Sequence, residues 1–412
     1  MTKPGNYCED IYVGQKIIMR QNLKARLGRY HNTGKNAVAP KAGERRETPK
    51  ATGFDESAWP GWVEAGFKTL KREVPQELSF PLHSTFAGAL PLLVPDIFRF
   101  GRLPQPQELL FFDLETTGLS GGAGTVAFLA AFGRFDISSD SDCLDKARLI
   151  ITQYLLLDYP GENDFIEKVV ADLLSDKVTA QSLVVSFNGK SFDSQILKSR
   201  CLMNRIKVPE YCHADLLHPA RRLWKKTLTD CSQATIETSV LGLDREGDVS
   251  GAMAPDIWFS FLRTGENREL LSVCDHNLRD ITGLSSLFLA MGEIAADPVG
   301  SRKRFRFNEE ALALFWHKAL KRRRYFAWDD ESNQRYSKTG DLLLKIAAQN
   351  GSFHSAIVLA KNSEWRLGDF QQALHYTELA LAFPSVPESV LIELEKRRSR
   401  LEEKMKRGNG PA

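Results

Sequence analysis

The chain lacks several features that would assign it to a class at once. It has six cysteines in 412 residues and no C-x-x-C pair, a pattern typical neither of a zinc site nor of a disulfide framework. It has no run of ~20 apolar residues, the length that a transmembrane helix needs. Lys3, Asn6, Glu9 and Asp10 interrupt any apolar signal region at the N-terminus. These absences predict a cytoplasmic protein with no membrane association.

The sequence also lacks a loop for binding nucleoside triphosphates. Glycines are frequent after the first apolar run, at Gly118, Gly121, Gly122 and Gly124. They do not match G-x-x-x-x-G-K-[ST], in which backbone amides surround the phosphates. We therefore expect a turn at this position rather than a triphosphate site.

Composition is that of an ordinary soluble protein, with 42% hydrophobic and 26% charged residues. The net charge is only +3, but it is unevenly distributed. Residues 1–50 hold eleven Lys/Arg against four Asp/Glu, and residues 301–325 hold nine against two. Such basic blocks favour a polyanionic partner. Solvated charge on a tail and a linker explains them equally well at this stage.

The length allows two or three domains, and local patterns divide the chain into five parts. We predict a basic, partly disordered N-terminal segment at 1–60 and an irregular lead-in at 61–104. An α/β (α+β) domain follows at 105–292, then a basic linker with a helix at 293–330 and a helical region at 331–412. Within the α/β domain we predict a hairpin at 108–135, a third strand at 148–157 and a helix at 164–174. A short buried strand at 182–187 and two further helices, one from Asp193 and one at 270–291, follow.

The last ~80 residues have helical periodicity and no strand-like run. Gly368-Asp369-Phe370, followed by Ala373, Ala380 and Pro384, matches the second half of a tetratricopeptide-type repeat. The preceding helix lacks the usual aromatic and Leu-Gly signature, and one repeat cannot bury its face alone. We predict a small helical, tetratricopeptide-like region that binds a protein partner or shields a cleft.

The most informative stretch is the one around Asp113 and Glu115. These two carboxylates follow the apolar run Leu109–Phe112, which predicts a buried strand. Residues i and i+2 of a strand point to the same face, and paired carboxylates suit a hard divalent cation. Alone, Asp-x-Glu would favour a solvated strand end, and the motifs further along the chain are what favour a metal site.

Further along the chain stand Asp193, His276 and Asp280. His276 and Asp280 are four residues apart, on one face of the predicted long helix. Four carboxylates brought into one cleft would repel one another unless cations lie between them. We therefore predict a site for two Mg²⁺ or Mn²⁺ ions, as in two-metal phosphoryl transfer. His276 would be the general base or would orient the attacking water.

The order Asp-x-Glu, Asn-x-x-x-Phe-Asp and helical His-x-x-x-Asp resembles the DEDD superfamily of 3′→5′ exonucleases, which have a ribonuclease H-like fold. The wider sequence resembles one branch, the YprB-type ribonuclease H-like domain, over roughly residues 105–290. The matching pieces are Asp113–Thr125, Phe187–Asp193, His213–Trp224, Leu262–Gly265 and His276–Asp280.

This resemblance implies a mixed sheet flanked by helices, with Asp113, Glu115, Asp193 and Asp280 as metal ligands. It departs from the family at His276. The branch that uses His places it five residues before the last Asp, whereas here the gap is four, the spacing of the branch that uses Tyr. The role of His276 as the base is thus less firmly implied than the four ligands, and packing or capping is its alternative.

Other residues are candidates for nucleic-acid contacts. Asn188 and Lys190 precede Asp193, and Arg221, Arg222 and Trp224 form a basic block with an aromatic inside it. Arg can pair with phosphates and Trp can stack on a base. The alternative is that Trp224 is a core residue with the charges on the outer face.

Asp215 is an additional acid in the His213–Trp224 piece. It would either support the site from behind or bond to backbone at a turn, and the structural reading is slightly favoured.

Taken together, the sequence predicts a metal-dependent nuclease, a 3′→5′ exonuclease acting on single-stranded DNA or RNA. The basic segments at 1–60 and 302–324 would add phosphate contacts that do not depend on sequence. Two alternatives stay open. One is a catalytically weak or inactive nucleic-acid-binding scaffold, and the other is an interaction protein that acts through its helical C-terminal region.

Overall fold

The computed structural model describes residues 56–82, 88–118, 124–137, 147–174, 182–320 and 329–408. All of them belong to the compact unit Phe54–Ala412. Most of the predicted basic N-terminal segment lies outside the described residues, as do residues 321–324 of the second basic stretch and two glycines of the predicted turn, Gly121 and Gly122.

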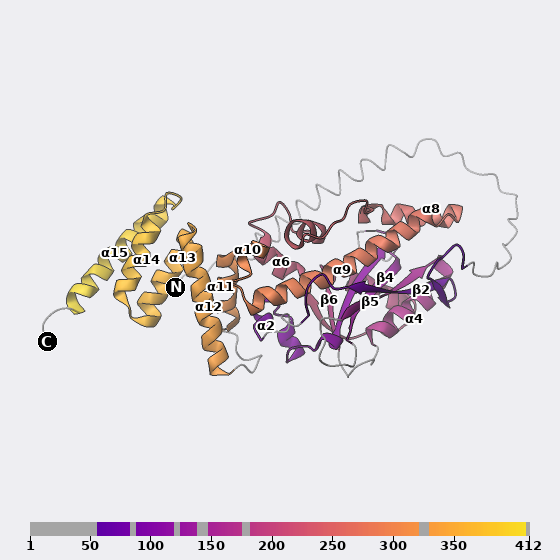
Figure 1. The fold of residues 1–412 in the computed structure, drawn as a ribbon, viewed down its shortest axis with the longest axis horizontal. Coiled ribbons are helices and arrows are strands. Elements are labelled where there is room, and N and C mark those ends of the chain that lie inside the picture. The colour runs from indigo at the N-terminus through magenta and orange to yellow at the C-terminus, as the bar shows by residue number, and fades with distance from the viewer. Residues whose placement is uncertain are drawn as a thin grey trace, which may run out of the picture. The chain divides into compact units, whose positions relative to one another are not determined.

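One mixed sheet of seven strands forms the centre of the fold (Figure 1). Its spatial order is β1-β2-β5-β4-β3-β6-β7. The strands from β1 to β3 are antiparallel to their neighbours, whereas β3, β6 and β7 run parallel. The bounds are Val63–Gly66, Thr69–Glu77, Leu109–Thr116, Ala127–Asp136, Arg148–Leu156, Leu183–Ser186 and Cys212–Asp215 for β1 to β7. The predicted mixed sheet is confirmed, including the hairpin of β3 and β4.

The predicted irregular lead-in at 61–104 was wrong over its first part. Residues 63–77 form β1 and β2, and β2 pairs with β5 along its whole length, from Thr69–Leu156 to Glu77–Arg148. The second half of β2 is largely polar and contains Pro75. Both features argue against a strand when only the sequence is considered. Because β2 lies near the sheet edge, it tolerates both polar residues and a proline that a central strand would exclude.

Helices cover both faces of the sheet. Along β3, Leu109 and Phe111 contribute to one core, while Leu110 and Phe112 contribute to the other. This alternation follows from the two-residue period of a strand. The helices α4 (Glu162–Leu173) and α5 (Asp193–Met203) pack in the second core, and α2 (Leu90–Leu93), α6 (Leu217–Trp224) and most of α9 (Arg268–Ala296) pack in the first.

Helix α9 is the element that brings the predicted site together. It runs beside β3, β4 and β5 (Figure 1) and contains the predicted helix 270–291. Gly133 of β4 permits this approach, because a Cβ there would lie 2.6 Å from Ile281 Cγ2. The close packing places the middle of α9, which carries His276 and Asp280, against the end of β3.

The remaining helices of this part of the chain are short. They are α3 (Ile97–Phe100), α7 (Gln233–Ile236), α8 (Ala254–Thr264), α10 (Arg302–Phe305), the π-helix η4 (Glu237–Leu241), and the 3-10 turns η1 (Pro106–Glu108), η3 (Tyr159–Gly161) and η5 (Gly251–Met253). Gly242 (φ 68°) ends η4 and Gly265 (φ 76°) ends α8, each in a left-handed conformation that glycine adopts without strain.

The predicted basic linker is largely a packed helix. α11 (Glu309–Leu320) buries Leu312, Ala313 and Trp316 against α2 and α6. In the same stretch, Arg304 pairs with Glu293 at 2.8 Å. The described part of this segment therefore belongs to the core of the unit rather than connecting two separate bodies.

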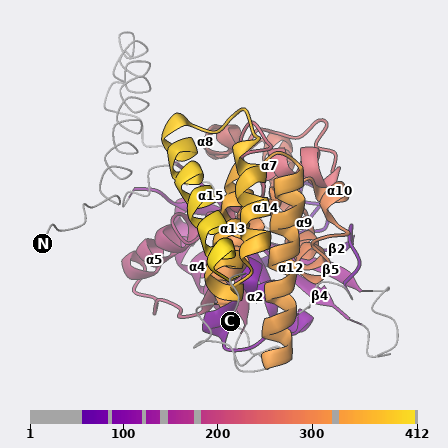
Figure 2. The ribbon, with the colours of Figure 1, turned by 90° about the vertical axis from the view of Figure 1, so that its left-hand side faces the viewer.

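After α11, described helices follow one another and each packs on the next (Figure 2). They are α12 (Asp330–Gln349), α13 (Phe353–Asn362), the π-helix η7 (Ser363–Leu367), α14 (Phe370–Leu381) and α15 (Glu388–Gly408). Asp369 caps α14 by accepting a hydrogen bond from the Gln372 amide at 2.8 Å. Ala373 and Ala380 are buried. The predicted helical C-terminal region is confirmed, and its likeness to a tetratricopeptide repeat stays a prediction.

No helix among those that the structure describes is long and apolar enough to cross a membrane. In the described part of the chain, Cys201, Cys231 and Cys274 are free thiols.

Candidate active site

The five residues predicted to be catalytic line one cleft of about 240 Å³. Two come from β3, one from the start of α5 and two from α9, and the full set is Asp113, Glu115, Asp193, His276 and Asp280. Phe187, Phe192 and Gly251 also line the cleft. The fold thus joins motifs that lie more than a hundred residues apart in sequence.

Asp113 is held in place by a chain of amides. Asn277 Nδ2 donates to Asp113 Oδ2 at 2.8 Å. Gln153 of β5 donates in turn to Asn277 Oδ1 at 2.8 Å, and Arg72 of β2 donates to Gln153 Oε1 at 2.6 Å. Asn277 and Gln153 are fully buried. A buried chain with every member bonded leaves few alternatives for the orientation of Asp113.

The loop before Asp193 is ordered by Asp215. Its Oδ1 accepts from the Asn188 and Leu217 amides at 2.8 and 3.0 Å, and its Oδ2 accepts from the Lys190 amide at 3.2 Å. Asn188 adopts a left-handed φ of 67°, which Asn tolerates better than most residues. The reading of Asp215 as a residue that bonds backbone at a turn is thereby confirmed, and its effect is to position the loop that carries Asp193.

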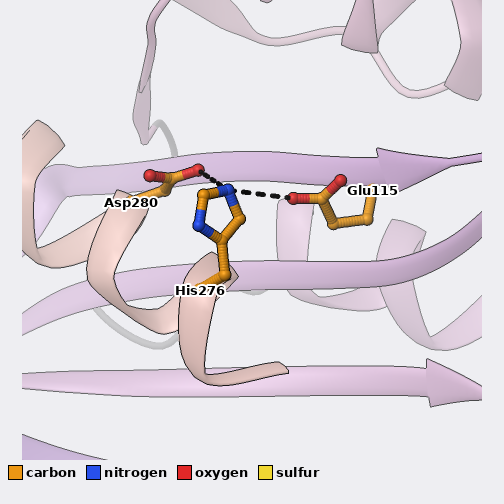
Figure 3. Close-up of side chains that lie close together, drawn as sticks. All are labelled: Glu115, His276 and Asp280. Carbon is orange, nitrogen blue, oxygen red and sulfur yellow. Dashed lines mark ion pairs between the residues drawn. The ribbon is translucent and has the colours of Figure 1, made fainter. Parts of the chain in front are cut away.

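His276 lies between two of the carboxylates (Figure 3). Its Nε2 is 3.3 Å from Asp280 Oδ2 and 4.0 Å from Glu115 Oε1. Its other nitrogen, Nδ1, is 2.9 Å from Asp248 Oδ2. Glu115, His276 and Asp280 can offer three ligand atoms that lie within 4.8 Å of one another. This arrangement is compact enough to surround one metal ion.

Three acids of the cleft, Asp113, Glu115 and Asp193, strongly disfavour the ionised state in the protein alone. Burial, followed by the charges of Asp193 and Asp280, raises the pKa of Asp113 well above its usual value. Burial and the charge of Asp113 do the same to the pKa of Glu115. Burial raises the pKa of Asp193 to about 7. A bound cation would reverse this effect, because it stabilises the charged carboxylates.

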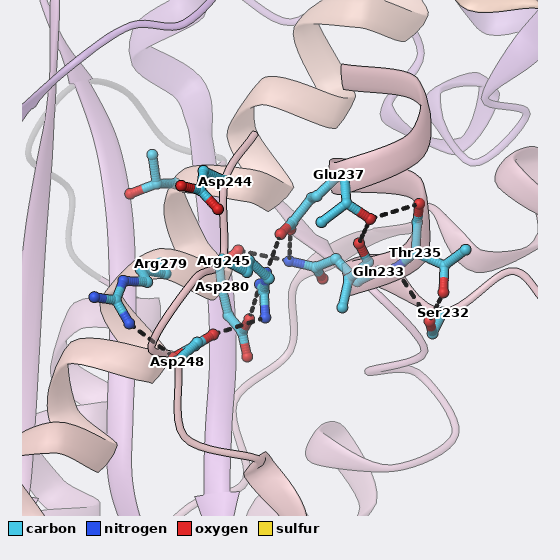
Figure 4. Close-up of polar contacts among 12 residues, drawn as sticks. Ser232, Gln233, Thr235, Glu237, Asp244, Arg245, Asp248, Arg279 and Asp280 are labelled. Atoms are coloured by element: carbon cyan, nitrogen blue, oxygen red, sulfur yellow. Dashed lines mark hydrogen bonds and ion pairs between the residues drawn. The ribbon is translucent and has the colours of Figure 1, made fainter. Parts of the chain in front are cut away.

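Behind Asp280, Arg245 forms the centre of an ion-pair network (Figure 4). Its guanidinium pairs with Asp280 Oδ1, with Glu237 Oε2 at 2.5 Å and with Asp248 Oδ2 at 3.3 Å. Arg279 also pairs with Asp248, at 2.9 Å. Burial nevertheless raises the pKa of Glu237 to about 7. The network ties the segment between η4 and η5 to the face of α9 that carries the site.

The predicted contact of Trp224 with nucleic acid was wrong. It is fully buried, and its indole N–H donates to the Phe305 carbonyl at 2.9 Å. Trp224 therefore cannot stack on a base, and the core alternative holds. The Arg222 guanidinium lies 3.2 Å from the centre of the Phe315 ring, and burial lowers the pKa of Arg222 to about 10. Arg222 thus packs between α6 and α11.

The other three predicted contacts lie in different settings. Arg221 is exposed on α6, and Asn188 is exposed on the cleft. Lys190 Nζ pairs with Asp96 at 2.5 Å, so its charge is already balanced. Contacts of these residues with nucleic acid stay predictions.

Sequence reasoning missed Asp248, Arg245, Glu237 and Asn277. Asn277 lies next to His276, inside the motif His276–Asp280, so its position in the sequence could have indicated a role in the site. Asp248 and Arg245 lie in a glycine-containing segment, Gly242–Gly251, with no regular spacing to the other motifs. Only the packing of this segment on α9 brings them to the site.

The sheet is mixed, with parallel β3, β6 and β7, is flanked by helices and carries carboxylates at the end of β3. These features define a protein of the ribonuclease H type. Residues 110–291 match the RNase_H superfamily, so the chain contains a domain of that superfamily. This fold generally serves to hydrolyse phosphodiesters. The chain is also 32% identical over 304 residues to "Uncharacterized protein YprB" of Bacillus subtilis (strain 168). The matched residues make up 67% of this chain and 69% of that protein. The chain therefore belongs to the same family as YprB.

Proposed function

We propose that this protein is a metal-dependent 3′→5′ exonuclease that hydrolyses phosphodiesters of single-stranded DNA or RNA. One observation carries the proposal. Four carboxylates, from Asp113, Glu115, Asp193 and Asp280, line one buried cleft, and burial with mutual repulsion raises the pKa of three of them. Such a cluster is costly for the protein alone and favourable around divalent cations.

The donor set fits two Mg²⁺ or Mn²⁺ ions, because carboxylate oxygens are the ligands that these ions prefer. When bound, such ions activate water and stabilise the leaving oxygen of a phosphoryl transfer. The protein contributes the orientation of the ligands. Asn277 fixes Asp113, the loop ordered by Asp215 presents Asp193, and Arg245 holds Asp280.

The walls of the cleft suit the end of a flexible strand. Phe187 and Phe192 are half-buried and line the cleft beside the exposed Asn188. Aromatic side chains pack against bases without regard to sequence. Arg221, and the basic segments at 1–60 and 302–324, would add phosphate contacts that weaken as salt concentration rises.

The test is cleavage of 5′-end-labelled single-stranded DNA and RNA with Mg²⁺, Mn²⁺ or EDTA, for the wild type and for Asp113→Asn. We expect products that shorten from the 3′ end, a need for metal, and a loss of at least 100-fold in rate for Asp113→Asn. Asp244→Asn is the matched control, because Asp244 accepts a local hydrogen bond from the Glu246 amide at 2.8 Å outside the cleft. Internal cuts would indicate an endonuclease. Binding with no cleavage of either substrate would indicate the non-catalytic scaffold.

A second role in protein binding is favoured by one observation in the helical C-terminal region. Trp365 and Leu367 of η7 are 72% and 60% exposed, and large apolar side chains exposed on one short helix are candidates for an interaction surface. Trp365→Ala should reduce capture of a partner while leaving nuclease activity unchanged. Equal loss of both would contradict a separate role for this surface.

A further inference from the structure

We infer that His276 is a ligand of a first-row transition metal ion, which it binds through Nε2 together with Glu115 and Asp280, and that Asp248 is the residue that orients it. This inference rests on the proposed function and deepens it, because it changes the role of His276 and names the class of ion. Nε2 has one lone pair, so a metal-bound His276 cannot also be the general base. The two roles are alternatives.

The first argument is the position of Nε2. It lies 3.3 Å from Asp280 Oδ2 and 4.0 Å from Glu115 Oε1. Ligand atoms stand about 2.0–2.2 Å from an ion of this class, so two of them on one ion are separated by at most about 4.4 Å. Both distances fall within this limit. The other oxygen of Asp280 is engaged by Arg245, which turns Oδ2 toward His276.

The second argument is the partner of Nδ1. Asp248 Oδ2 lies 2.9 Å from it but outside hydrogen-bonding geometry, and the charge of a carboxylate this close favours the proton on Nδ1. Nε2 is then left with its lone pair directed at Glu115 and Asp280. Metal-binding histidines commonly have such a partner, which fixes the tautomer and the ring orientation. Asp248 is itself held by Arg245 and Arg279.

The third argument is space. Gly251 of η5 faces Nε2, and a Cβ at this position would lie 3.0 Å from it. No glycine-specific φ is needed at this residue, so its backbone does not require glycine. The absence of a side chain instead keeps the approach to Nε2 open for an ion and its water.

The choice of ion follows from the nitrogen. Mg²⁺ binds oxygen ligands and loses water reluctantly, whereas imidazole suits later first-row ions, with affinity rising from Mn²⁺ through Co²⁺. A site of two carboxylates and one imidazole should therefore bind Mn²⁺ more tightly than Mg²⁺. The resemblance alone pointed to oxygen ligands and did not separate these two ions.

The experiment is pulsed EPR of the metal-free full chain loaded with Mn²⁺, together with calorimetric titration by Mn²⁺ and by Mg²⁺. We expect nitrogen coupling to Mn²⁺ in the wild type and its loss in His276→Gln. The Mn²⁺ Kd should rise about 10- to 100-fold in Asp248→Asn, the usual effect of removing such a partner, while the Mg²⁺ Kd changes much less. Asp244→Asn, in the same segment, should match the wild type in both measurements.

Gly251→Ala provides a variant that leaves every ligand in place. It should weaken Mn²⁺ binding by crowding Nε2, and circular dichroism verifies that each variant is folded. If His276→Gln fails to fold, loss of nitrogen coupling in Asp248→Asn or Gly251→Ala gives the same answer.

Bound Mn²⁺ with no nitrogen coupling in the wild type, or with coupling that persists in His276→Gln, would overturn the inference and leave the proposed nuclease intact. Nitrogen coupling without cleavage of any substrate would support His276 as a metal ligand and contradict the proposed nuclease. Failure of the wild type to bind Mn²⁺ would overturn the inference, and failure to bind Mg²⁺ as well would contradict both.

Discussion

Asp193 lies at the start of α5 and is a buried residue of the cleft lining. Its surroundings show how a single residue can be unfavourable for folding and favourable for function. Backbone amides of Asp193 and Leu114 stabilise its charge, but burial outweighs them and raises its pKa to about 7. The unfolded chain would have a pKa of about 3.9 for this group. The difference makes the stability of the metal-free protein depend on pH.

The sign of this dependence follows from proton uptake. Below about pH 4 the group is protonated in both states and contributes nothing. As pH rises from there to about 7, the unfolded state loses its proton while the folded state keeps it, so the free energy of unfolding falls. We expect a loss on the order of 4 kcal/mol, complete above about pH 7, and Asp193→Asn should remove it.

Urea unfolding in EDTA at pH 4, 5.5 and 8 measures this effect as the difference between the wild type and Asp193→Asn. The variant should be the more stable protein at pH 8, with the advantage shrinking toward pH 4. Mn²⁺ should restore the wild type at pH 8. A difference that does not vary with pH would contradict the assigned pKa.

Among the elements, α9 has the largest influence on the site, because its contact with the sheet sets the distance between two groups of ligands. Phe111 of β3 and Ile281 of α9 lie in the same core. Gly133 of β4 faces both, and a Cβ there would lie 2.6 Å from Ile281 and 3.3 Å from Phe111. The distance of His276 and Asp280 from β3 therefore depends on a missing side chain one strand away.

Gly133→Ala should destabilise the protein by about 1–3 kcal/mol, the usual cost of overpacking a core. It should also lower the cleavage rate, because α9 must shift away from β3. Thermal unfolding and the cleavage assay measure the two effects. Gly124→Ala is the matched control, since a Cβ at Gly124 has no atom of the described residues within 4 Å. Equal stability of the two variants would show that α9 is not seated as tightly as its contacts indicate.

For the whole described unit, the main question is whether sheet and C-terminal helices unfold together. One core runs from Phe111 of the sheet through Trp224 and Trp316 to Tyr336 and Leu344 of α12. Trp316 is 1% exposed and meets Tyr336 edge to face, with ring centres 6.2 Å apart. A continuous core of this kind favours one cooperative transition.

Trp316→Ala should cost about 3–5 kcal/mol, as for other buried aromatic residues, and should lower hydrogen-exchange protection in β3 as well as in α12. Calorimetry should show one transition for residues 54–412. Trp365→Ala, at a tryptophan that is 72% exposed, should change stability little. Two separate transitions, with β3 protection unchanged, would mean that the helical region is energetically independent.

The sequence by itself determined the features that depend on neighbours along the chain. Alternation and apolar runs predicted β3, β4 and β5, and helical spacing predicted α4, α9 and the helical character of the C-terminal region. These patterns are local, because the periods of strands and helices are properties of a few consecutive residues. Motif order also indicated that Asp113, Asp193 and Asp280 belong to one site.

Only the tertiary structure decided what those residues meet. The pairing of β2 with β5 placed a polar, proline-containing segment in the sheet, and packing of α6 under α10 and α11 buried Trp224. The contact of Asp248 with His276 joins a glycine-containing segment to a helix face. Such contacts depend on how whole elements pack, and packing against distant residues leaves no period in the sequence to read.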